Sequence, residues 1–130
     1  MAFLAAYVVP HPPLVVPEVG HGQEAGIPAT TAAFRLIASE IAALKPDTIV
    51  IVSPHNRIHR NFFHISGGEG WESSFRDFRA PSPVISAKYD KALALEITRA
   101  ARAAGLEAGH YDEERPGDSA SDHGSLVPLY

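Results

Sequence analysis

Residues 29–55 read ATTAAFRLIASEIAALKPDTIVIVSPH. Apolar residues recur at helical spacing in the first part of this stretch, at Phe34, Ile37, Ile41 and Leu44. That spacing predicts a helix over about residues 29–44, with Thr30 or Thr31 as its cap. Residues 48–53 are then almost wholly apolar and β-branched, which predicts a buried strand that stops at Pro54.

Upstream of this stretch, residues 3–9 form another apolar run that stops at a proline, Pro10. A strand, a helix and a second strand with short joins predict a right-handed βαβ unit with parallel strands. Further along, the pattern predicts strands at about 62–66 and 107–111 and a helix over about 89–104 that ends at Gly105. Residues 71–83 are expected to be irregular, and residues 112–121 to be a polar loop. The predicted fold class is α/β, with a mostly parallel central sheet flanked by helices.

Length, composition and charge limit the class of protein. The chain has 130 residues, of which 45% are hydrophobic, and carries a net charge of −4. These values predict one domain that binds neither nucleic acid nor membrane. The chain has no cysteine, which excludes disulfides and thiolate metal sites, and the start lacks a signal peptide. We therefore expect a cytoplasmic protein.

The last residues, 126–130, are largely apolar, which is unusual for a natural C-terminus. We therefore expect residues 1–130 to be the N-terminal part of a single α/β domain whose native chain continues beyond residue 130. The sheet would then be incomplete, and its uncovered edge would favour self-association into a homo-oligomer.

Two histidines occupy matching positions. His11 and His55 each follow a predicted strand and lie next to prolines, which stiffen the backbone. The carboxyl ends of parallel strands meet at one edge of a sheet, where ligands bind. Imidazole is a common ligand of iron and zinc, so the pair is a candidate metal site. The alternative is that two histidines follow strands by chance.

His123, in Asp122-His123-Gly124, is the third candidate. A neutral imidazole suits general acid–base catalysis, and Asp122 would orient the ring. Alternatively, Asp122 caps a helix and His123 is merely a residue of its first turn. The other histidines, His21, His59, His64 and His110, are expected to be solvated or to pack in loops and sheet. Glu18 and Asp122 are the carboxylates nearest these histidines in sequence, and neither has a strong claim to bind metal.

Four segments together resemble the LigB-like family, the catalytic B subunits of class III extradiol ring-cleavage dioxygenases. The segments are residues 7–14, 16–20, 52–55 and 122–130, and they occur in family order. The resemblance extends to Memo-like proteins and is greatest to the N-terminal domain of the AmmeMemoRadiSam system protein A family. It covers the whole chain, which corresponds to about the first half of the family domain.

The resemblance implies that His11 and His55 bind Fe(II) and that His123 is the acid–base or substrate-orienting residue. It also implies that a glutamate ligand and a further histidine come from later in the domain. The substrates would be a catechol-like aromatic diol and O2. A second, C-terminal domain is expected as well.

Two alternatives stay open. One is a non-redox metal-binding or scaffold domain of an AmmeMemoRadiSam-type system. The other is a hydrolase that uses the same histidines with zinc.

Overall fold

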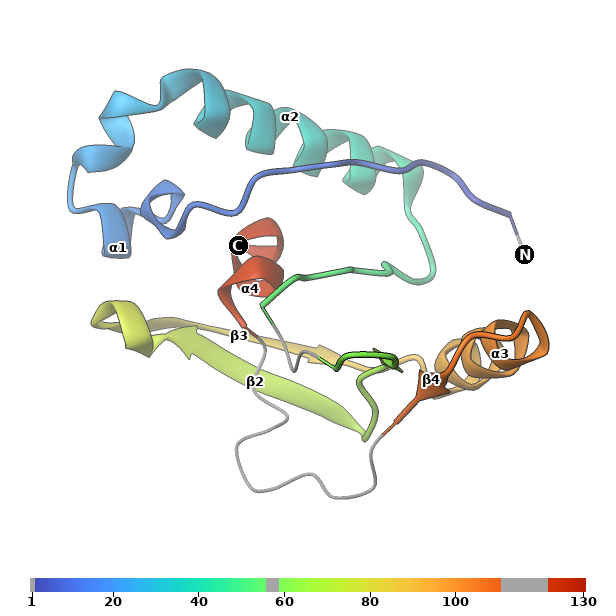
Figure 1. Ribbon diagram of the computed structural model, residues 1–130. Helices are drawn as coiled ribbons and strands as arrows, with labels where there is room; N and C mark the ends of the chain where they lie inside the picture. Colours follow the sequence, from blue (N-terminus) through green and yellow to red (C-terminus); the bar gives the residue numbers. More distant parts are fainter. Residues whose placement is uncertain (1, 56–58, 111–121) are drawn as a thin grey trace.

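The computed structural model describes residues 2–55, 59–110 and 122–130 and shows a mixed α/β arrangement (Figure 1). The helices are α1 (Pro17–Gly20), α2 (Pro28–Leu44), α3 (Lys91–Ala103) and α4 (His123–Leu129). The strands are β1 (Phe63–His64), β2 (Gly70–Phe75), β3 (Ala80–Lys88) and β4 (Ala108–Gly109). Short 3-10 turns complete the list: η1 (Pro13–Val15), η2 (Gln23–Gly26) and η3 (Arg76–Phe78). The predicted α/β class is confirmed.

The core lies where α4 packs between two layers. In Figure 1, α1 and α2 lie on one side of α4, and the β2–β3 hairpin lies on the other. Both layers and α4 itself supply buried apolar side chains. These are Val15 and Val16 from the turns before α1, Phe75 and Ala80 from the hairpin, and Leu126 and Val127 from α4. Burying these side chains fixes α4, and so fixes the position of His123 at its first turn.

Both long helices were predicted within two residues of their ends. Helix α3 ends as its glycine indicated: Gly105 has φ 80°, and the Leu106 N–H bonds the Ala101 carbonyl at 2.9 Å. The predicted cap of α2 was wrong. Its N-cap is Ile27, and Thr31 donates back to the Ile27 carbonyl at 3.2 Å. Pro28 occupies the first helical position, where its fixed φ suits the helix and an N–H would have no partner within the helix.

Parallel pairing is present, but not between residues 3–9 and 48–53, and it joins two strands that lie within the segments predicted at 62–66 and 107–111. β1 pairs with β4 in parallel, with Phe63 opposite Ala108 and His64 opposite Gly109. Residues 3–9 and 48–53 were predicted as buried parallel strands, and this was wrong. Both are coil, and Phe3, Val8 and Val52 are 99%, 102% and 91% exposed. Their β-branched composition favours an extended backbone, but a strand also needs a hydrogen-bonded neighbour, which composition does not supply.

The prediction of irregular structure over residues 71–83 was also wrong. β2 and β3 form an antiparallel hairpin, with Trp71 opposite Ala87 and a register shift after Ser74. Pro81 and Pro83 broke the alternating pattern in the sequence. Proline is tolerated in a strand whose N–H groups need no partner, as in a two-stranded ribbon with open edges. The predicted loop at 112–121 lies outside the described residues.

Asp90 links Thr48, at the start of the 48–53 coil, to the first turn of α3. Its Oδ1 accepts from the Leu93 N–H at 3.0 Å, and its Oδ2 accepts from the Thr48 hydroxyl at 2.6 Å. The Thr48 hydrogen bond, and then the Leu93 amide, lower the pKa of Asp90 below its usual 3.8. Since the folded pKa is lowered, the ionised carboxylate stabilises the fold above pH 3.8, and this contribution disappears as pH falls through the lowered value.

We therefore expect α3 to lose helicity in acid, beginning below about pH 4. Circular dichroism at 222 nm, between pH 2 and 6, measures the loss. Asp90→Asn is the control, because asparagine also caps helices but does not titrate in this range. An identical acid transition in both proteins would contradict the assignment.

Candidate metal centre

Three histidines from distant parts of the chain converge at one place. One ring nitrogen from each of His11, His55 and His123 lies within 4.8 Å of the others. Ring centroids are 4.7 Å apart for His11 and His55, 4.2 Å for His55 and His123, and 5.6 Å for His11 and His123. Across the described ranges, no other group of three or more histidines, aspartates or glutamates has this geometry.

His11 is positioned by the turns that follow it. The Val15 N–H bonds the Pro12 carbonyl at 3.0 Å, and the Val16 N–H bonds the Pro13 carbonyl at 3.0 Å. Val16 is fully buried in the core. Proline fixes φ on both sides of His11, so the ring is attached through stiff backbone to a buried anchor.

His55 ends the coil that begins at Thr48, and its side chain is exposed. Thr48 holds the start of this coil to Asp90, and Ser53 holds its end to Asp122, with the Ser53 hydroxyl 2.6 Å from Asp122 Oδ1. The His55 N–H also donates to the Ser53 hydroxyl at 3.3 Å. Side-chain hydrogen bonds at both ends thus take the place of the predicted strand ladder.

His123 is the first residue of α4, and Asp122 is the N-cap. Asp122 Oδ1 accepts from the Gly124 N–H at 2.7 Å. The predicted capping by Asp122 is confirmed, and His123 nevertheless belongs to the three-histidine cluster, while its acid–base role stays a prediction. The ring also packs edge-on against Phe78, with centroids 5.4 Å apart. The cap and the buried face of α4 together aim the imidazole at the other two.

The pair His11 and His55 shares a short contact. Their Nε2 atoms are 2.7 Å apart, so one nitrogen donates and the other accepts. Two nitrogens on one tetrahedral ion, each at about 2.1 Å, lie about 3.4 Å apart. Ring rotations that move the two Nε2 atoms apart by less than 1 Å would reach that spacing, and the His55 side chain is exposed while that of His11 is partly so. The donor set and its convergence therefore fit a divalent metal such as iron or zinc.

Burial lowers the pKa of His123 below its usual 6.5, and the neighbouring His55 and His11 rings lower it as well, while Asp122 opposes the shift. A lowered folded pKa means that the unfolded chain takes up the proton more readily. His123 therefore stabilises the fold above pH 6.5, and this contribution is lost as pH falls through the lowered value.

We expect His123 in the metal-free protein to titrate below pH 6.5 and to be neutral at pH 7. The pH dependence of its ring proton shifts in NMR measures this midpoint. Asp122→Asn should lower the midpoint further, because it removes the charge that favours the protonated ring. A midpoint at or above 6.5 in the unmodified protein would contradict the assignment.

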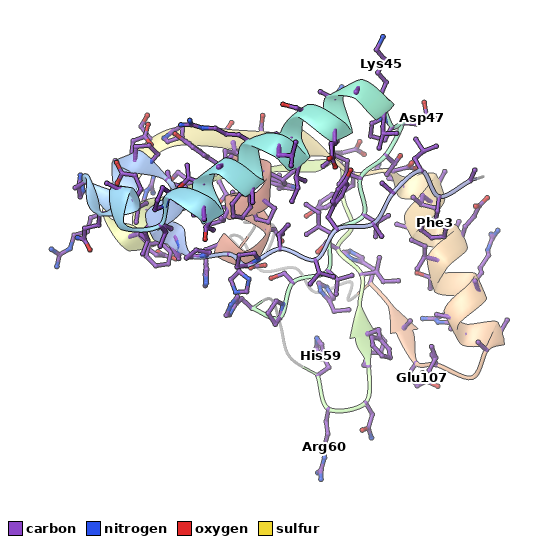
Figure 2. The ribbon with its side chains drawn as sticks, turned by 90° about the horizontal axis from the view of Figure 1, so that it is seen from above. Phe3, Lys45, Asp47, His59, Arg60 and Glu107 are labelled. Carbon is purple, nitrogen blue, oxygen red and sulfur yellow. The ribbon has the colours of Figure 1, made fainter. Side chains whose placement is uncertain are left out.

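The remaining histidines lie apart from the cluster. His21 is exposed and follows α1 with φ 48°. His59, on the side of the molecule away from α2 in Figure 2, belongs to a second aromatic group with Phe62, His64 and His110. Glu18 accepts from the Tyr130 hydroxyl at 3.1 Å. Neither Glu18 nor Asp122 belongs to the three-histidine group.

Sequence reasoning missed Ser53, Gly124 and Phe78. Ser53 lies two residues before His55, and Gly124 directly follows His123. Their positions beside candidate ligands were the signal available. Phe78 lies in the stretch predicted to be irregular, and nothing in the sequence linked it to His123.

Comparison with known proteins found two matches to the sequence of this chain. A family model described as the catalytic LigB subunit of aromatic ring-opening dioxygenase matches residues 5–130. Protein CA_C1420 of Clostridium acetobutylicum is 36% identical over 143 aligned positions, which cover 100% of this chain. The chain spans only 29% of that relative's length. No solved structure matches the chain significantly. The match over nearly all of its length shows that the chain belongs to the LigB family of aromatic ring-opening dioxygenase subunits.

Proposed function

We propose that this chain supplies the histidine side of the metal centre of an Fe(II)-dependent extradiol dioxygenase. The substrates are a catechol-like aromatic diol and O2. The observation that carries the proposal is the convergence of three imidazoles, with ring nitrogens within 4.8 Å of one another, in a LigB family chain. Imidazole ligands with positions left open are typical of non-haem iron oxygenases.

His11 and His55 are the proposed ligands. When bound, Fe(II) would supply a Lewis acid and a redox bridge between the diol and O2. His123 has a lowered pKa, so its imidazole is neutral near pH 7 and can accept a proton from a substrate hydroxyl. The carboxylate ligand that the family resemblance implies would come from outside residues 1–130, so the proposal concerns the intact protein.

The experiment uses the full-length protein, loaded anaerobically with Fe(II) and given a catechol before O2. An oxygen electrode measures uptake, and absorbance measures the ring-opened product. We expect one O2 consumed per ring opened. His123→Ala should keep the bound iron and lose most of the uptake. Iron that binds tightly without any O2 uptake across a panel of catechols would overturn the dioxygenase proposal.

Zinc chemistry is the second candidate, because three imidazoles with an open position are also a zinc donor set. A zinc-dependent hydrolase would work without oxygen, so activity of the zinc-loaded protein under anaerobic conditions would favour it. A non-redox scaffold role is separated from both by His11→Ala and His55→Ala, which would then change neither metal content nor activity.

We also propose a cytoplasmic location and a small-molecule substrate rather than nucleic acid. The net charge of −4 and the absence of cysteine in the sequence support this. In the part of the chain that the structure describes, none of the helices has the length and apolar character needed to cross a membrane.

A further inference from the structure

We propose that Ser53, Asp122 and Gly124 form a latch that sets the separation of His55 and His123. The latch acts on the proposed metal centre and so rests on that proposal. It joins two segments that are 69 residues apart in sequence. All three are positioning residues, since each acts through a neighbouring histidine and none is proposed to contact the metal or the substrate.

The hydrogen bonds of the latch meet at two atoms. Asp122 Oδ1 accepts from the Ser53 hydroxyl at 2.6 Å and from the Gly124 N–H at 2.7 Å. The Ser53 hydroxyl oxygen in turn accepts from the His55 N–H at 3.3 Å. The backbones beside His55 and His123 are therefore linked through one hydroxyl and one carboxylate oxygen. Hydrogen bonds to a carboxylate are stronger than those between neutral groups.

Close packing at Gly124 is the second observation. A Cβ at this position would lie 2.4 Å from the Ser53 hydroxyl oxygen, 2.8 Å from Asp122 Oδ1 and 3.1 Å from His55 Cδ2. The first two distances are shorter than any ordinary contact, so even a methyl group must move the serine or the carboxylate. Gly124 is helical and buried and does not have a positive φ, so close approach explains this glycine.

Helix capping alone does not account for the arrangement. A cap needs only the Asp122 carboxylate and an N–H in the first turn, which Gly124 supplies. Ser53 contributes nothing to that cap, yet its hydroxyl makes the shorter of the two bonds to Asp122 Oδ1. The hydroxyl is well placed to hold the end of the 48–53 coil, where no strand ladder holds it.

The test compares variants of the full-length protein in Co(II) affinity, measured by competition with a chromophoric chelator. Partners that orient metal ligands are worth on the order of 10- to 100-fold in affinity, so we expect Ser53→Ala to weaken binding by that factor. Ser53→Thr keeps the hydroxyl and should retain most of the affinity. Gly124→Ala should weaken binding and shift the Co(II) absorption bands.

Ser39→Ala is the matched control, because the exposed Ser39 hydroxyl donates to the Arg35 carbonyl within α2. It should leave affinity unchanged. If Ser53→Ala also binds Co(II) as tightly as the unmodified protein, the latch is wrong.

A metal-free measurement separates failure of the latch from failure of the metal centre. The His55 and His123 rings, with centroids 4.2 Å apart, should give an NMR nuclear Overhauser effect in the unmodified protein. We expect Ser53→Ala to weaken this effect and Ser53→Thr to restore it. Should the unmodified protein bind no metal, the proposed function fails, and the ring contact still decides for or against the latch.

Discussion

Replacing His11 or His55 by alanine is expected to weaken binding of Fe(II) or Zn(II) to the full-length protein by on the order of 100-fold or more. Each imidazole contributes one ring nitrogen to the cluster, and no described carboxylate belongs to the group to substitute for it. Because the two Nε2 atoms are only 2.7 Å apart, both rings face the same point, and loss of either opens the site. Anaerobic calorimetry or chelator competition measures the change.

His21→Asn is the matched control for these variants. His21 is exposed, lies outside the cluster and has φ 48°, a conformation that asparagine tolerates better than alanine. Its metal affinity should equal that of the unmodified protein. If the His11 and His55 variants bind metal as tightly as the unmodified protein, these histidines do not form a metal centre, whatever activity the whole protein has.

The sequence predicted the two long helices, α2 and α3, well because their periodicity is local. The apolar stripe of α2 and the Gly105 stop of α3 depend on residues within a few turns of one another. The β structure depends on distant partners, and there prediction succeeded only in part. The strands predicted at about 62–66 and 107–111 contain β1 and β4, but the other β elements were predicted wrongly. The β2–β3 hairpin was not predicted because prolines interrupt its alternating sequence pattern. The apolar runs at 3–9 and 48–53 were predicted as strands, but both are coil in the structure.

His11 and His55 were expected to meet because each was expected to follow one of two adjacent parallel strands. The structure brings the rings together without them, through the buried turn at Val16 on one side and the Ser53 hydrogen bond on the other. The chemical roles of the three histidines stay predictions. What sequence could not supply is the contact between Ser53 and the start of α4, because nothing local indicates which residues meet across 69 positions.

Phe75→Ala is expected to have the largest effect on stability among side chains away from the cluster. The Phe75 side chain is 1% exposed and lies in the core with Leu126 and Val127 of α4. Its ring also packs edge-on against Tyr130, with centroids 6.2 Å apart. Truncating a buried phenylalanine costs about 3–5 kcal/mol, and a typical domain has only about 5–15 kcal/mol of stability.

The consequence should extend to the metal centre, because α4 carries His123 and is held by the same core. In the full-length protein, we expect hydrogen exchange of the β2 and α4 amides to accelerate by about 100-fold or more in Phe75→Ala, as a loss of 3 kcal/mol requires. Phe3→Ala is the control, since Phe3 is 99% exposed and its removal should change stability by less than about 0.5 kcal/mol. If α4 exchange is unchanged in Phe75→Ala, this core does not position His123, and the helix must be held by its cap and the latch alone.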